Sequence, residues 1–169
     1  MNMDLVELRI NSVRLEHGEP SVLLEDPRSG RFLSITVGPF EASALIIKLE
    51  GIVPPRPLTH DLLADVFLEA GFSLDYAELF EKGGSRARLS YRKDGLCMTK
   101  EVRPSDALAL SLRLGAPIMA DPSILKDPIF RPSLFKRGRK KIIYTGLKKG
   151  AARKSADITV FGQKPHRLP

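Results

Sequence analysis

Two stretches of this sequence carry a proline where an α-helix can begin and a glycine where it can end: Pro39 with Gly51, and Pro104 with Gly115. A proline costs little in the first turn of a helix, because the N–H groups of that turn have no partner within the helix. A glycine can take the left-handed conformation in which many helices end. The sequence therefore predicts one helix over residues 39–50 and another from residue 104 to residue 115.

The same kinds of signal predict a third helix and the strands around all three helices. Thr59 can act as the N-cap of a helix over residues 60–70, which Gly71 would end. Apolar runs bounded by turn residues predict strands over residues 6–10, 21–26, 31–38, 72–80, 85–92, 96–102 and 117–120. Because the strands come in runs separated by single helices, the predicted fold class is α+β, with a mostly antiparallel sheet and three helices.

The pattern of elements stops near residue 127, and the rest of the chain is strongly basic. Residues 131–169 contain 12 lysines and arginines and one acid, whereas acids outnumber bases in the other 130 residues. We therefore expect a single domain over residues 1–127 and a basic, mobile tail over residues 128–169. The tail can neutralise the phosphates of RNA or DNA, with Lys136, Arg137, Arg139, Lys140, Lys141, Lys148 and Lys149 as candidate contacts. The positive charge of this tail would also suit an acidic protein partner, or the tail could be a solvated segment with no partner.

The composition also bears on the compartment. The one cysteine, Cys97, cannot form an internal disulfide, which fits a reducing compartment. The first residues lack the basic start and apolar run of a secretion signal, and no window approaches the 18 or so apolar residues of a membrane span. The sequence thus predicts a cytoplasmic protein with no membrane span. Because Cys97 falls in a predicted strand, we expect its side chain to be buried.

The first predicted helix is apolar on nearly all sides. One stripe consists of Ala42, Leu45, Ile46 and Leu49, and Phe40, Ala44 and Ile47 extend it around the helix. A helix of this kind is typically covered on more than one face, by the sheet and by another subunit. We therefore expect a homo-oligomer.

Charged side chains stand in the first turns of all three predicted helices. They are Glu41 in the first helix, His60 and Asp61 in the second, and Arg103 and Asp106 in the third. As structural groups, acids complement the helix dipole and an arginine can pair locally. As chemical groups, the histidine can transfer protons, the carboxylates can bind a metal ion or orient water, and the arginine can hold a phosphate. No spacing rule links the three helix starts, so the sequence leaves open whether these side chains converge.

The two helix segments resemble the signature stretches of the bifunctional nuclease family. The matching motifs are Glu41-Ala42, Glu50-Gly51, Pro55-Arg56-Pro57, Thr59-His60-Asp61 and the run from Arg103 to Ala107, Arg-Pro-Ser-Asp-Ala. The resemblance extends from about residue 5 to residue 127. Glu101 stands where the family often has an aspartate, and Ser85 and Arg86 stand where it often has aromatic residues. The resemblance therefore does not imply that bases stack on that strand.

What the resemblance implies is a nuclease that cleaves both RNA and DNA with a divalent metal, Mg²⁺ or Mn²⁺. The catalytic candidates are then Glu41, His60, Asp61 and Asp106, with Asp61 and Asp106 as metal ligands. Arg103 and Arg56 would contact phosphate. The alternative is a non-catalytic module that binds nucleic acid, or regulates a partner, through its basic tail.

Overall fold

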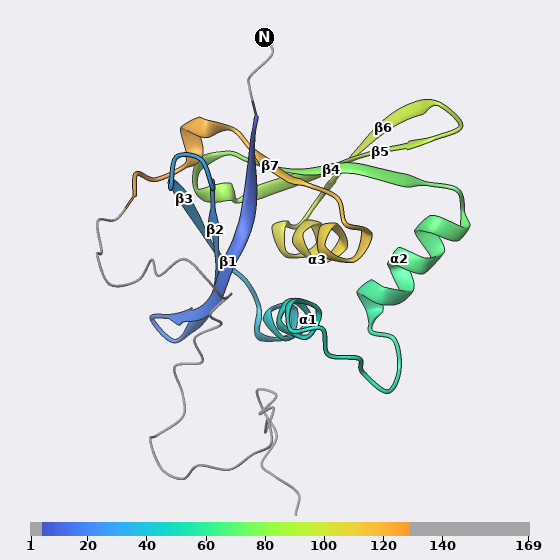
Figure 1. Ribbon diagram of the computed structural model, residues 1–169, viewed down its shortest axis with the longest axis horizontal. Coiled ribbons are helices and arrows are strands. Elements are labelled where there is room, and N and C mark those ends of the chain that lie inside the picture. Colours follow the sequence, from blue (N-terminus) through green and yellow to red (C-terminus); the bar gives the residue numbers. More distant parts are fainter. Residues whose placement is uncertain (1–4, 129–169) are drawn as a thin grey trace, which may run out of the picture.

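The computed structural model describes residues 5–128, and these form one sheet covered by helices (Figure 1). The strands run in the spatial order β3-β2-β1-β7-β4-β5-β6. Only the pairing of β4 with β7 is parallel; the other pairings between strands in this part of the chain are antiparallel. The strands are β1 (Val6–Glu16), β2 (Glu19–Glu25), β3 (Phe32–Thr36), β4 (Ser73–Phe80), β5 (Arg86–Lys93), β6 (Leu96–Val102) and β7 (Ile118–Ala120).

Three helices lie on the same side of this sheet in Figure 1: α1 (Pro39–Leu49), α2 (Thr59–Glu69) and α3 (Pro104–Leu114). Helix α3 lies between the other two and contacts both, as well as β4 and β5. Its apolar residues from Ala107 to Leu110 are buried, and Gly115 ends it in the left-handed conformation with φ 68°. The predicted α+β fold with a mostly antiparallel sheet and three helices is therefore confirmed. Because α3 touches both neighbours, its first turn can meet theirs.

Several local predictions need correction. The first strand continues to Glu16, because His17 and Gly18 form a tight turn, both with positive φ, that leads straight into β2. Thr59 is the first helical residue of α2 rather than its N-cap, which is Leu58. Cys97 is exposed rather than buried, and it lies on β6, one of the two edge strands of the sheet. Strand propensity alone cannot tell an edge strand from a central one.

Large apolar side chains are exposed along α1, α2 and the loop between them. They are Phe40, Val53, Leu62, Leu63, Val66 and Leu68. Exposed apolar patches often mark interfaces, so this surface agrees with the expected homo-oligomer, which stays a prediction. Among the described residues, no helix is long and apolar enough to cross a membrane. The predicted basic tail, with its seven candidate nucleic-acid contacts, lies outside the described residues.

Candidate active site at the three helix starts

The first turns of the three helices meet at one place. The Arg103 guanidinium donates to both oxygens of Asp106, from Nε to Oδ2 at 2.9 Å and from Nη2 to Oδ1 at 3.1 Å. Its Nη1 also reaches Oε1 of Glu41 on α1, at 3.4 Å. From α2, Nε2 of His60 lies 3.3 Å from Oδ1 of Asp106. We call Glu41, His60, Arg103 and Asp106 the helix-start cluster.

The electrostatics of this cluster centre on Asp106. Partial burial raises the pKa of its carboxyl, but hydrogen bonds from Arg103 and His60 outweigh that effect, so the net pKa lies below its usual value. Asp106 is therefore an anion at neutral pH and can hold the His60 ring in one orientation. The side chain of Arg103 is 69% exposed, whereas that of His60 is only 17% exposed. The cluster thus combines a sheltered histidine–aspartate pair with a cation that faces solvent.

Glu41 reaches the cluster because its side chain folds back over Gly38. Gly38 is the N-cap of α1, with φ −68° and ψ 158°, a conformation that any residue can adopt. A Cβ atom at this position would nevertheless collide with the Glu41 carboxylate, whose Cδ would lie only 3.1 Å away. The observed position of the Glu41 side chain therefore needs a glycine here, although the backbone does not.

We expect Gly38→Ala to displace the Glu41 carboxylate from Arg103 at little cost in stability. The new methyl group meets the end of a flexible side chain, and the backbone of Gly38 suits alanine. If Glu41 orients Arg103, Gly38→Ala should slow nucleic-acid cleavage about as much as Glu41→Gln does, by up to about tenfold. Cleavage rates and thermal unfolding of the two variants give the comparison. A Glu41→Gln variant that loses activity beside a fully active Gly38→Ala would show that the Glu41–Arg103 contact is irrelevant.

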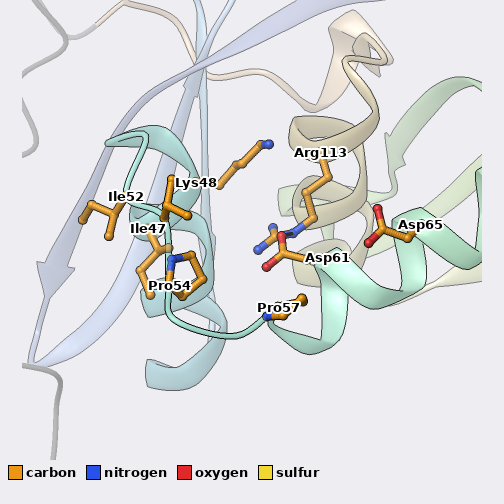
Figure 2. A pocket seen from close by; sticks show the side chains of 9 residues that line it. Ile47, Lys48, Ile52, Pro54, Pro57, Asp61, Asp65 and Arg113 are labelled. Carbon is orange, nitrogen blue, oxygen red and sulfur yellow. Dashed lines mark hydrogen bonds and ion pairs between the residues drawn. The ribbon is translucent and has the colours of Figure 1, made fainter.

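Asp61 belongs to a different set of contacts, although it follows His60 in sequence. Its Oδ1 accepts from Nε of Arg113 at 2.6 Å, and its Oδ2 accepts from the backbone N–H of Leu58 at 2.8 Å. Burial raises the pKa of Asp61, but these two hydrogen bonds outweigh it and lower the pKa overall. Asp61 thus satisfies an N–H at the start of α2 and ties α2 to the last turn of α3. Figure 2 shows this carboxylate beside the Arg113 guanidinium.

The two predicted metal ligands, Asp61 and Asp106, lie in separate sets of contacts, and their role as metal ligands stays a prediction. The oxygens of Asp106 accept from Arg103 and His60, and those of Asp61 accept from Arg113 and Leu58. Between residues 5 and 128, no three histidine, cysteine, aspartate or glutamate side chains gather as metal ligands would. Each carboxylate is paired with an arginine, so a divalent ion would have to compete with that arginine for its oxygens.

Of the other predicted residues, Arg56 lies apart from the cluster. It is exposed in the proline-rich loop between α1 and α2, and within the described residues it forms no hydrogen bond or ion pair. The structure thus brings together four of the six residues predicted for catalysis and phosphate contact in the folded domain. It separates Asp61 and Arg56 from them.

Arg113 is a site residue that the sequence analysis missed. It follows Asp106 by seven residues, which on an α-helix places both on the same face about 10 Å apart. Adjacent residues of α2 are thereby held at two points of α3: His60 by Asp106, and Asp61 by Arg113. The i, i+7 spacing of Asp106 and Arg113, matching the His60-Asp61 pair, was the available signal. This spacing can be interpreted only once α2 is known to pack across α3.

Comparison with known proteins gives matches over most of the described domain. A family model described as "Bifunctional nuclease domain" matches residues 22–131. Two proteins of Mycobacterium tuberculosis are each 34% identical to this chain over 123 residues: "Uncharacterized protein MT1877" of strain CDC 1551 / Oshkosh and "Uncharacterized protein Rv1829" of strain H37Rv. Each alignment covers 70% of this chain and 73% of the relative. The matched region of the family model contains all three helix starts.

Proposed function

The chain belongs to the bifunctional nuclease domain family, and from that premise we propose that it hydrolyses phosphodiester bonds of RNA and DNA at the helix-start cluster. The observation that carries this proposal is the convergence of His60, Arg103 and Asp106. They come from two helices far apart in sequence and form a histidine–aspartate pair beside an exposed arginine. These are the groups that proton transfer and phosphate binding require.

The hydrogen bonds suggest a role for each side chain. With a proton on Nε2, His60 donates to Asp106, and its Nδ1 is then free to accept a proton from an attacking water. The water oxygen forms the new bond to phosphorus as the bond from phosphorus to the leaving oxygen breaks. The proton on Nδ1 can then pass to that leaving oxygen. The exposed guanidinium of Arg103 stabilises the negative charge that develops on the phosphoryl oxygens.

In this scheme Asp106 and Glu41 position other groups. Asp106 holds both the His60 ring and the Arg103 guanidinium, and Glu41 holds the far side of Arg103. A bound phosphate would compete with Glu41 for Arg103, because the Nη1–Oε1 contact at 3.4 Å is the longest in the cluster. Dependence on Mg²⁺ or Mn²⁺ stays a prediction, and no step of this scheme passes through a metal ion.

The test is cleavage of single-stranded RNA and DNA by the full chain in Mg²⁺, Mn²⁺ or EDTA, with two matched arginine variants. Arg103→Ala should slow cleavage by about 10²-fold or more, the usual cost of losing one group that stabilises a developing oxyanion. Arg92→Ala removes an exposed arginine that is also paired with an acid, Asp75, on β5 outside the cluster. It should leave the rate unchanged. If the two variants changed the cleavage rate equally, the activity would come from another site or from a co-purified nuclease.

A second candidate function is non-catalytic binding of nucleic acid, and the composition of residues 131–169 favours it. Twelve cations with one acid would bind phosphates by releasing counterions, whatever the base sequence. In that case the helix-start cluster would serve to join the three helices. Steeply salt-dependent binding without cleavage in any of the three metal conditions would support this function and overturn the nuclease.

A further inference from the structure

Arg113 has more hydrogen-bond donors than the described part of the chain satisfies. Its side chain is only 3% exposed. Nε donates to Asp61 and Nη1 donates to the carbonyl of Ala109 at 3.2 Å. A guanidinium carries five N–H donors, so three are left without a partner among residues 5–128. Nη2 is not fully buried and Arg113 lines a cleft, so its free donors can meet an acceptor there.

These donors lie at a cleft of about 280 Å³ between α1 and the start of α2. Figure 2 shows Lys48 and Arg113 extending into the space between α1 and α3 from opposite sides. Lys48 is exposed, and within the described residues it takes part in no ion pair or side-chain hydrogen bond. Apolar side chains of Ile47, Ile52 and Pro57 form much of the remaining wall. Two cations from different helices thus face one partly apolar cleft.

We propose that this cleft binds a phosphate group between Lys48 and Arg113. The planar guanidinium suits an oxyanion, and the lysine opposite adds a second charge. Asp61 pairs with Arg113 and offsets its charge, so the site relies on the free Nη2 donors of Arg113 and on the unpaired charge of Lys48. Asp65, one turn further along α2 and exposed at the edge of the cleft, weakens anion binding.

The phosphate could come from a small free anion or from a nucleic-acid strand. Arg113 lies about 10 Å along α3 from Asp106, so a strand held at the helix-start cluster could place another of its phosphates in the cleft. The strand source rests on the proposed function, whereas the phosphate site itself does not. Binding of inorganic phosphate therefore tests the cleft separately from cleavage.

The experiment follows the Arg113 side-chain Nε–H signal by ¹H–¹⁵N NMR in the full chain, at constant ionic strength. Inorganic phosphate and a short single-stranded oligothymidylate are the two probes. The signal should shift saturably with at least one of them. Lys48→Ala should weaken that binding about tenfold, and Lys48→Arg should largely retain it. Asp65→Asn should tighten it severalfold, because it removes the opposing charge.

The control is Lys100→Ala, which removes another exposed lysine on the edge strand β6, far from the cleft. It should leave phosphate affinity unchanged. Saturation by inorganic phosphate assigns the site to a free anion, and a response only to the oligonucleotide assigns it to a strand. No shift with either probe would overturn the proposal, as would equal effects of Lys48→Ala and Lys100→Ala.

Discussion

Replacing His60 with glutamine is expected to slow nucleic-acid cleavage by about 10²- to 10⁴-fold, the usual contribution of a group that transfers protons. Glutamine can still donate a hydrogen bond to Asp106, so the contact that joins α2 to α3 can persist. It has no basic nitrogen, so it cannot take a proton from water. The loss should therefore appear in kcat while the melting temperature changes by only a few degrees.

His17→Gln is the matched control, because it makes the same change in the exposed turn between β1 and β2. Its cleavage rate should equal that of the wild-type protein. An active His60→Gln protein would remove His60 from the mechanism.

Asp61→Ala is expected to lower the free energy of unfolding by about 3–5 kcal/mol, because it leaves the buried charge of Arg113 without its partner. The variant also loses the acceptor for the N–H of Leu58, and hence part of the cap of α2. A small domain is stable by only about 5–15 kcal/mol, so much of the protein could unfold at 37 °C. Any loss of cleavage should then disappear once the rate is divided by the folded fraction.

A double-mutant cycle with Asp61→Asn and Arg113→Met measures the pairing itself. The double variant should lose less stability than the two single changes added together, because neither charge is then left alone. Urea unfolding at neutral pH gives the four free energies. Purely additive losses would mean that the two side chains act independently of each other.

The stability of the wild-type protein should also depend on pH through Asp61 and Asp106. The fold lowers the pKa of both carboxyls, so their contribution is complete above the unfolded-state pKa of about 4 and is lost as the pH falls through the folded-state values. Asp61→Asn should therefore be less sensitive than the wild type to acid below about pH 4.

The local signals in the sequence were enough for the elements and the fold class. The helix ends predicted from Pro39, Pro104 and Gly115 agree with the observed ends to within one residue. These residues act through their own backbone conformation, so their effect does not depend on the rest of the fold. The strands predicted over residues 72–80, 85–92 and 96–102 likewise lie within about a residue of β4, β5 and β6. Thr59 was predicted as the cap because threonine is a good capping residue, but the N–H of the N-cap Leu58 is satisfied by Asp61, three residues after Leu58.

The arrangement of the site could not be predicted from these signals. Whether Glu41, His60 and Asp106 meet depends on the crossing of three helices over one sheet, which no short-range pattern encodes. Asp61 and His60 are neighbours in sequence, but their side chains leave α2 in different directions. They therefore contact different ends of α3. The buried state of Arg113 follows from that same crossing, and an arginine near a helix end otherwise suggests only a solvated charge.

The most direct test of one shared centre is the cleavage rate of the double variant His60→Gln/Arg103→Ala beside its two single variants. Residues that act as a unit give strongly non-additive losses, because removing either one already disables the step that both serve. We expect the double variant to cleave single-stranded RNA within about threefold of the slower single variant, with all three proteins equally folded. Losses that multiply, or single variants as fast as the wild type, would contradict an active centre at the meeting of the three helix starts.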